Sequence, residues 1–119
     1  MWYPVPIETP QGQKLMSTRS RIGILNDDGS VYSIYCHYDG YTCGVGKCLA
    51  AHYTDPEKVR ELIELGDISS HSPSVQDFRG IGGVQYYYLF CDGEWLVCAS
   101  YRCDKFQNLE DAIHQDARV

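Results

Sequence analysis

The residues best suited to chemistry form a glycine-rich segment, Gly44-Val45-Gly46-Lys47, which follows a predicted strand that carries His37. We expect this segment to open a helix. Unpaired amides and the positive dipole end of a helix N-terminus favour an anion, and glycines let a ligand approach the backbone. The segment is not a Walker A loop, because it lacks the GxxxxGK frame and the following Ser or Thr. The pattern therefore predicts an anion-binding pocket.

The ligand expected in this pocket is a small anion, in particular a nucleotide-like molecule. Arg19, Arg21 and Lys47 would donate charge-assisted hydrogen bonds to phosphate or carboxylate, and tyrosine rings would stack on a base. The expected ligand-binding residues are Arg19, Arg21, Tyr35, His37, Tyr38, Tyr41, Gly44, Gly46 and Lys47. With such a pocket, Arg21→Ala weakens binding and barely changes stability. In the alternative interpretation the glycines serve a tight turn, and the arginines pair with Asp39 or Asp27.

Catalytic chemistry has little support in the sequence. His37 and Asp39 could act as an acid–base pair in a small hydrolase. Cys36 is adjacent to His37, but neighbours on a strand point to opposite faces, so this histidine cannot activate the cysteine. The sequence contains no paired-carboxylate motif, metal-ligand spacing or nucleophile elbow. We therefore expect no catalytic residue, metal or cofactor, and keep the small hydrolase as an alternative.

The composition restricts the class of partner. The chain has 119 residues, and its 16 acidic against 10 basic side chains give a net charge of -6. This balance disfavours general nucleic-acid binding, which needs a basic surface. No apolar run approaches the roughly 18 to 20 residues that span a bilayer, and the N-terminus lacks the pattern of an export signal. We expect a soluble, cytoplasmic protein without membrane contact.

The cysteines are expected to be free thiols, because the missing export signal favours a reducing compartment. Their spacing is too loose for a zinc site, so they are interpreted as small apolar side chains. They are Cys36, Cys43, Cys48, Cys91, Cys98 and Cys103.

The chain is expected to form one α+β domain over residues 17–119, preceded by an extended arm at residues 1–16 that is rich in proline. Two β-hairpins form an antiparallel sheet, a central helix pair packs on it, and a short helix capped by Asn108 ends the chain. The predicted order is ββααββα. Parallel pairing is not expected, because each hairpin has a tight turn.

The first hairpin is predicted around Gly29, between runs at 19–26 and 30–38. A three-residue loop with Gly29 in the left-handed conformation pairs Ile22 with Ile34, which creates one apolar face. Because side chains alternate along a strand, the opposite face is polar. It pairs Arg19 with His37 and Arg21 with Tyr35.

Two helices are predicted in the middle of the chain. Apolar residues recur at helical spacing from Val45 to Tyr53, with His52 packing on the apolar stripe. The second helix is capped by Asp55 and ends at Gly66, interpreted as a residue of the usual glycine C-cap. Residues 67–83 are rich in Ser, Pro and Gly, which predicts a long surface connection.

The second hairpin is predicted at Asp92-Gly93, a strong two-residue turn signal. It pairs Phe90 with Trp95 and Tyr88 with Val97, and both of its faces are apolar. Such a hairpin is either covered on both sides or offers an aromatic face to a partner. We expect a homo-oligomer, above all a homodimer, that uses the aromatic residues of this hairpin or the arm. These residues are Tyr86, Tyr87, Tyr88 and Trp95, or Trp2 and Tyr3.

Several stretches resemble a family of small, uncharacterised bacteriophage-encoded proteins. They are TRSRIGI (18–24), SIYCHYDGY (33–41), GVGK (44–47) and HYTDPEKVRELIELGDIS (52–69), together with the closing aromatic hairpin. The resemblance extends over about residues 17–108. Family members begin at the residues that match Met16-Ser17-Thr18, so the arm departs from the family pattern. The resemblance carries no residue roles. It implies an accessory phage protein that acts in an infected bacterial cell.

Such proteins often act by binding, which is an argument from context. We expect a role that includes counter-defence, in the host cytoplasm, by sequestering a small anionic or nucleotide-like ligand. The alternative is an inhibitor that docks on a host protein through an aromatic and acidic surface, with its negative charge steering it towards a basic partner.

Overall fold

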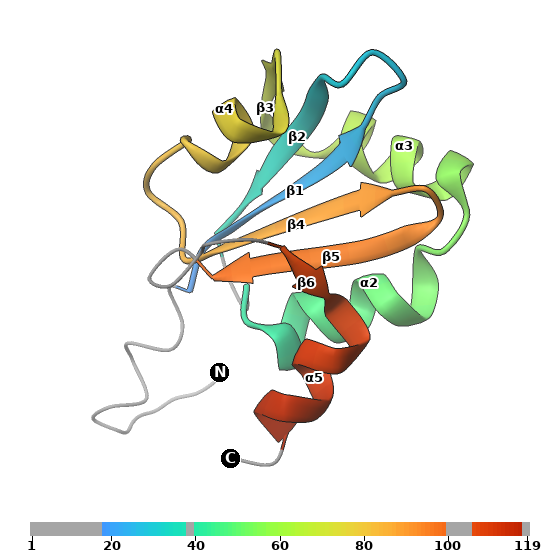
Figure 1. The fold of residues 1–119 in the computed structure, drawn as a ribbon, viewed down its shortest axis with the longest axis vertical. Helices are drawn as coiled ribbons and strands as arrows, with labels where there is room; N and C mark the ends of the chain where they lie inside the picture. The colour runs from blue at the N-terminus through green and yellow to red at the C-terminus, as the bar shows by residue number, and fades with distance from the viewer. Residues whose placement is uncertain (1–17, 38–39, 100–105, 118–119) are drawn as a thin grey trace.

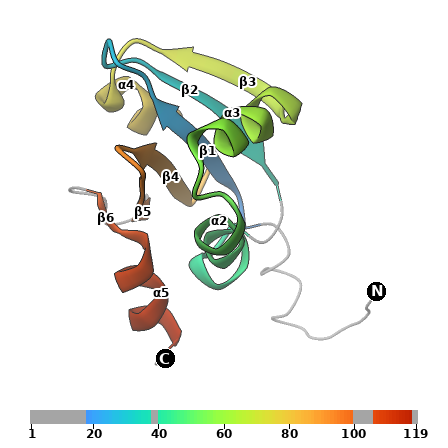
Figure 2. The ribbon, with the colours of Figure 1, turned by 90° about the vertical axis from the view of Figure 1, so that its right-hand side faces the viewer.

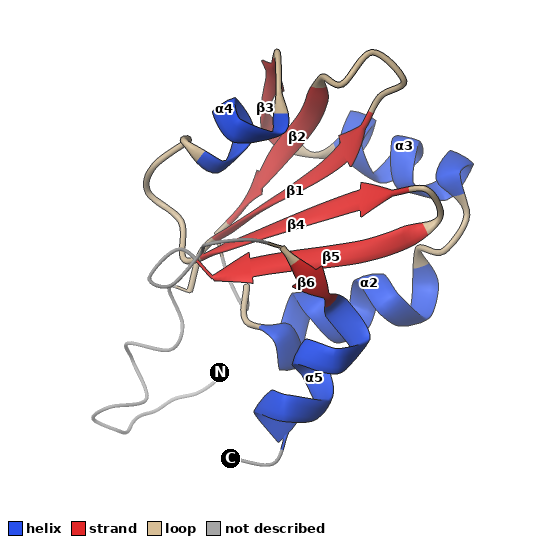
Figure 3. Cartoon of the chain, viewed as in Figure 1, coloured by secondary structure: helices blue, strands red, loops and turns tan. Residues whose placement is uncertain are grey.

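The computed structural model describes residues 18–37, 40–99 and 106–117, so the predicted arm lies outside the described residues. Within them, six strands form one mixed sheet in the order β3-β2-β1-β4-β5-β6 (Figure 1). The strands are β1 (Ser20–Leu25), β2 (Val31–Cys36), β3 (Asp67–Ser72), β4 (Tyr86–Cys91), β5 (Glu94–Ala99) and β6 (Gln107–Asn108). The helices are the π-helix η1 (Thr42–Gly46) and the α-helices α2 (Lys47–His52), α3 (Pro56–Leu65), α4 (Val75–Arg79) and α5 (Leu109–Ala117). The predicted α+β class is confirmed (Figure 3).

The first hairpin has the predicted register. Ile22 lies opposite Ile34, and Ile24 lies opposite Tyr32. The turn is closed by a hydrogen bond from the Asn26 backbone amide to the Ser30 backbone oxygen at 2.8 Å, and Gly29 has a φ of 91°. A glycine tolerates this left-handed conformation because it has no Cβ.

The second hairpin is also confirmed, with Tyr88 opposite Val97 and Phe90 opposite Trp95. Both turn residues, Asp92-Gly93, have positive φ, as a two-residue turn of type I′ requires. Strand β4 lies between β1 and β5, and Tyr88, Phe90 and Trp95 are buried within the fold. The hairpin is therefore covered on both sides, and its buried aromatic residues do not form the expected dimer surface.

The prediction of an all-antiparallel sheet is wrong. Strands β1 and β4 pair in parallel, with Ser20 opposite Tyr86 and Ile24 opposite Phe90. A tight turn fixes the direction of pairing only within its own hairpin. The two hairpins are joined by a long crossover between β2 and β4, which lets β4 return beside β1 in the same direction.

The prediction that residues 67–83 form a long surface connection is wrong, because this segment contains β3 and α4. Strand β3 pairs antiparallel with β2 at the edge of the sheet. Ser74 caps α4: its hydroxyl accepts from the Asp77 amide at 3.1 Å and donates to the Asp77 carboxylate at 3.0 Å. Phe78 is fully buried beneath this short helix. Strand β3 is mostly polar, and α4 has five residues of which Phe78 is buried. Segments this short show no clear periodicity of apolar residues in the sequence.

The two faces of the sheet carry separate cores, with α2 and α3 on one side and α4 on the other (Figure 2). Ile22, Ile24 and Ile34 pack against the central helix pair, as predicted, and α5 completes this core. The core on the α4 side is smaller. Its buried members are Val31, Phe78, Val84, Tyr87, Leu89 and Cys98.

The helix boundaries follow the predicted caps. The Asp55 carboxylate accepts from the Glu57 amide at 3.0 Å before α3, and the Asn108 side chain accepts from the Asp111 amide at 3.2 Å before α5. The predicted helix from Val45 to Tyr53 is formed by η1 and α2, and starts earlier, at Thr42.

Three local expectations are corrected. Gly66 ends α3 in an extended conformation, with a φ of -80°, and is not a left-handed cap. His52 is exposed instead of packed on the apolar stripe of its helix. Cys98 is disulfide-bonded, so the expectation of free thiols is wrong there, whereas four other cysteines are free. They are Cys36, Cys43, Cys48 and Cys91.

Candidate functional site

The fold brings four of the predicted ligand-binding residues to one face of the sheet, at the end where β1 begins and β2 ends. Arg21 lies opposite Tyr35, and extending the same register by two residues places Arg19 opposite His37. The Tyr35 hydroxyl and the His37 Nδ1 atom are hydrogen-bonded at 2.8 Å. We call Arg19, Arg21, Tyr35 and His37 the arginine face. It lies on the same side of the sheet as α4.

Arg21 is buried, with 4% of its surface exposed. Its Nε atom donates to the Ser33 hydroxyl at 3.0 Å, and its Nη2 atom donates to the backbone oxygens of Ser33 at 3.2 Å and Ile68 at 2.7 Å. All three acceptors are neutral. Burial lowers the pKa of Arg21, and the nearby Tyr87 opposes this shift. The Nη1 atom makes no hydrogen bond within the part of the chain that the structure describes, so it can bind a further acceptor.

Arg19 is half-buried and anchored by its backbone. Its amide donates to the Gln85 side chain at 2.7 Å, and its backbone oxygen accepts from the Gln85 amide at 2.9 Å. The Nε atom of Arg19 is buried and has no hydrogen-bond partner among the described residues. A buried donor without an acceptor costs about 1 to 3 kcal/mol. An acceptor supplied by a ligand would remove this cost.

A third arginine lies near the same face. Burial raises the pKa of Tyr87, and the positive charges of Arg79 and Arg21 both lower it, which places the two guanidinium groups near the phenol. The Tyr87 hydroxyl donates to the backbone oxygen of Ile81. Arg79 also lies over the ring of Phe106, with 6.0 Å between the guanidinium carbon and the ring centroid. Sequence reasoning missed Arg79 because it lies in the segment predicted to be a surface connection.

The glycine-rich segment lies on the opposite side of the sheet. Val45 packs against the core that contains Ile22 and Ile34. The amides of Gly44 and Gly46 donate to the Tyr41 oxygen, at 2.9 and 3.4 Å, so neither is free to bind an anion. A Cβ atom at Gly46 would lie 3.2 Å from Leu109 and 3.4 Å from the Tyr88 hydroxyl. The glycine therefore permits a close helix contact.

The remaining predicted residues are not part of the arginine face. Lys47 is exposed at the start of α2, beyond the sheet, and Tyr41 is half-buried before η1. Tyr38 and Asp39 lie outside the described residues, so the pairing of His37 with Asp39 is not placed. Cys36 packs against the core on the α2 side, away from the arginine face.

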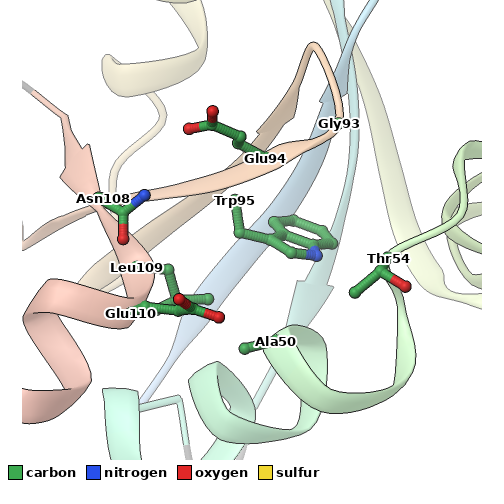
Figure 4. A pocket seen from close by; sticks show the side chains of 8 residues that line it. All are labelled: Ala50, Thr54, Gly93, Glu94, Trp95, Asn108, Leu109 and Glu110. Carbon is green, nitrogen blue, oxygen red and sulfur yellow. The ribbon is translucent and has the colours of Figure 1, made fainter.

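Two adjacent hollows lie between α2 and α5, on the side away from the arginine face. The first has a volume of about 310 Å³ and reaches the β4–β5 turn (Figure 4). The second has a volume of about 350 Å³ and shares Ala50 and Glu110 with the first. The first is lined by Ala50, Thr54, Gly93, Glu94, Trp95, Asn108, Leu109 and Glu110. The second is lined by Lys47, Ala50, Ala51, Glu110, Ile113 and His114.

Neither region forms a metal site, since no group of three or more His, Cys, Asp or Glu side chains able to hold a metal occurs among the described residues. None of the helices within residues 18–37, 40–99 and 106–117 is long and apolar enough to cross a membrane.

Comparisons of the chain with protein-family models, curated proteins and solved structures found no match.

Proposed function

We propose that this protein binds a small anionic, nucleotide-like ligand on the arginine face and acts by sequestering it. The observation that carries this proposal is the burial of Arg21 with neutral acceptors only, in a chain of net charge -6. A buried charge is costly unless an opposite charge or strong hydrogen bonds compensate it. An anion bound there would supply the opposite charge.

The available donors fit a phosphate or carboxylate group. The Nη1 atom of Arg21 and the buried Nε atom of Arg19 make no hydrogen bond to the described residues. Charged donors of this kind form short, strong hydrogen bonds to oxyanions. The ring centroids of Tyr35 and His37 are 5.9 Å apart, so two rings border the same face. A ring beside a cationic cluster is suited to stacking on a base while the arginines hold a phosphate.

Calorimetry with a panel of cyclic and linear nucleotides, and with inorganic phosphate, tests this proposal. Arg19→Gln is the better probe, because Arg19 is less deeply buried than Arg21. It is expected to weaken binding by roughly 10- to 100-fold, the loss of one or two charge-assisted hydrogen bonds. Lys47→Ala is the control, since Lys47 lies on the other side of the sheet, and it should leave the affinity unchanged.

Two results would contradict the proposal. One is the absence of binding heat with every member of the panel at millimolar concentration. The other is a loss of binding in Lys47→Ala that Arg19→Gln does not show. Recovery of the intact ligand after release supports sequestration, whereas recovery of a cleaved product supports the small hydrolase with His37 and Asp39.

A second candidate function is docking on a host protein, and exposed apolar residues at the sheet edge favour it. Leu65 and Ile68 are 84% and 67% exposed, and they flank the start of the edge strand β3. An edge strand offers unpaired backbone groups to another chain. In this case Leu65→Asp abolishes partner binding while Arg19→Gln does not. In both cases we propose a bacteriophage accessory protein that acts in the cytoplasm of the infected cell, as the family resemblance implies.

A further inference from the structure

Strand β3 leaves one edge of the sheet without a neighbour. It pairs with β2 on its inner side and stands last in the strand order, so among the described residues no strand lies beside its outer side. In Figure 2, β3 lies along the upper border of the molecule. The outward backbone N–H and C=O groups of such a strand can pair with another chain.

The sequence of β3 lacks the side chains that usually prevent pairing at an edge. Proteins protect edge strands with charged residues, above all lysine, or with proline. After Asp67 the strand reads Ile-Ser-Ser-His-Ser over residues 68–72, without an acidic residue, Lys, Arg or Pro. The chain as a whole has a net charge of -6, and like charges placed opposite each other destabilise a strand pair. An uncharged edge is therefore a place where a second copy of this acidic chain meets little repulsion.

Apolar side chains are exposed at the start of this edge. Among the described residues, Leu65 and Ile68 are the two large apolar side chains that are exposed. Ile68 also has a φ of 51°, which is unfavourable for a β-branched residue and persists only where neighbouring groups hold it. Arg21 holds its backbone oxygen at 2.7 Å. The fold thus presents Ile68 to solvent in a fixed conformation, which lowers the entropy cost of binding a partner there.

A second copy fits this edge, because an antiparallel pair of identical strands is symmetric. A two-fold axis at Ser70, perpendicular to the sheet, places Ser70 opposite Ser70 of the second copy. Ser69 then lies opposite His71, and Ile68 lies opposite Ser72. The whole uncharged segment is paired, and no two like charges face each other within it. Ile68 of each copy is covered by the end of the other strand, which removes apolar surface from water.

We propose that β3 pairs antiparallel with β3 of a second copy and joins two six-stranded sheets edge to edge in a homodimer. This surface differs from the aromatic hairpin expected from the sequence, whose side chains are buried. The two-fold axis keeps both arginine faces on one side of the joined sheet. Five strand spacings separate the two Arg21 residues, roughly 24 Å, so each copy keeps its own face and the dimer does not depend on a ligand. The second copy occupies the edge in place of a host protein.

Analytical ultracentrifugation of the full chain tests the proposal. We expect the weight-average mass to rise with concentration from 13.5 kDa towards twice that value. Hydrogen exchange at low and high concentration locates the contact. Amides within residues 68–72 are expected to exchange more slowly in the dimer, and those of the turn at Asp92-Gly93 are expected to keep their rates.

Ser69→Lys introduces the usual protecting residue at an exposed position of the edge, and it is expected to weaken association roughly tenfold or more. His52→Lys is the matched control, because His52 is exposed on α2 and the replacement adds the same charge. Both variants lower the net negative charge, so a general charge effect would strengthen association in both. Only pairing through β3 predicts that Ser69→Lys weakens it while His52→Lys does not.

Ile68→Asn separates the loss of the interface from the loss of the fold. Asparagine adopts the left-handed conformation more readily than a β-branched residue, so the variant should not reduce the free energy of unfolding of the single chain. Urea denaturation at a concentration where the chain is monomeric measures this. Association is expected to weaken roughly five- to tenfold, because an exposed apolar side chain is removed from the contact.

Three results would overturn the proposal. The first is the mass of a single chain at every concentration up to the millimolar range, which leaves the edge to a partner of another kind. The second is a dimer that Ser69→Lys and Ile68→Asn leave intact, with unchanged exchange at residues 68–72, which places the contact elsewhere. The third is equal weakening by His52→Lys and Ser69→Lys, which shows an effect of charge alone.

Discussion

The Nη2 atom of Arg21 lies 2.7 Å from the backbone oxygen of Ile68, a residue 47 positions later in the chain. The bond passes across β2, because Arg21 belongs to β1 and Ile68 belongs to β3. Ile68 has a φ of 51°, a left-handed conformation that a β-branched residue rarely adopts. In this conformation the backbone oxygen of Ile68 accepts the hydrogen bond from Arg21. The guanidinium group therefore fixes the beginning of the edge strand.

This arrangement predicts that Arg21→Met destabilises the fold. The substitution keeps an unbranched apolar chain but removes all three hydrogen bonds of the guanidinium group, so the backbone oxygens of Ser33 and Ile68 lose a buried partner. We expect the free energy of unfolding to fall by about 2 to 4 kcal/mol. Urea denaturation measures it. The sequence-based expectation that removing Arg21 barely changes stability does not fit the burial of this side chain.

Ser33→Ala is the control for this prediction. It removes only the hydroxyl that accepts from the Arg21 Nε atom and leaves the bonds to the two backbone oxygens in place. We expect a smaller loss, about 1 to 2 kcal/mol. Equal losses in both variants would show that the hydroxyl contact, and not the link to β3, carries the effect.

Gly66→Ala tests the close contact between α3 and the sheet. A Cβ atom at this position would lie 2.3 Å from Cδ1 and 2.7 Å from Cγ2 of Ile34, which is buried. Either α3 or the Ile34 side chain must move, and overpacking of this kind costs about 1 to 3 kcal/mol. Thermal and urea unfolding measure the loss. Gly82→Ala is the matched control, because a Cβ atom there meets nothing within 4 Å.

The local parts of the fold could be predicted from the sequence. Gly29 and Asp92-Gly93 fix the two hairpins and their registers, because a turn and the alternation of side chains act over a few residues. The parallel pairing of β1 with β4 could not be predicted in this way, since it depends on where a long connection returns. Strand β3 was missed because its side chains are mostly polar and its apolar Ile68 is exposed.

The candidate site was predictable to the same extent. Alternation along β1 and β2 correctly places Arg21 and Tyr35 on one face. The helix pair was predicted on the apolar face of Ile22, Ile24 and Ile34, and η1 and α2 do pack there, opposite the arginine face. Lys47 is therefore separated from the arginines that were expected beside it. The depth of Arg21 was also missed, because β3, to which its guanidinium group is hydrogen-bonded, was not predicted.

The turn of the first hairpin predicts a dependence on acid pH. The Asp28 carboxylate accepts from the Ser30 hydroxyl at 2.6 Å and from the Ser30 amide at 3.0 Å, and these hydrogen bonds lower the pKa of Asp28. Because the folded state binds this proton less tightly than the unfolded state, the stabilisation is present at neutral pH. It is lost as the pH falls below the ordinary range of an aspartate.

An NMR titration of the Asp28 side chain is the direct measurement. Its midpoint should lie below the ordinary range of an aspartate. Ser30→Ala removes the hydroxyl donor and should raise the Asp28 midpoint. An Asp28 midpoint that Ser30→Ala leaves in place would show that the hydroxyl does not cause the shift.

The β4–β5 turn predicts the order in which the free cysteines react. Burial raises the pKa of Cys91, and the negative charges of Asp92 and Glu94 raise it further. The thiolate is the reactive form, so at pH 8 Cys91 should be alkylated by iodoacetamide more slowly than the exposed Cys43 and Cys48. Mass spectrometry of peptides from a time course measures the three rates in one sample.

Glu94→Gln separates the two causes of this slow reaction. It removes one negative charge and leaves the burial of Cys91 unchanged, so Cys91 should react faster while Cys43 and Cys48 keep their rates. Glu61→Gln, which removes a charge from α3, should change none of the three rates. If Glu94→Gln also leaves Cys91 unchanged, burial and the neighbouring Asp92 set its reactivity without Glu94.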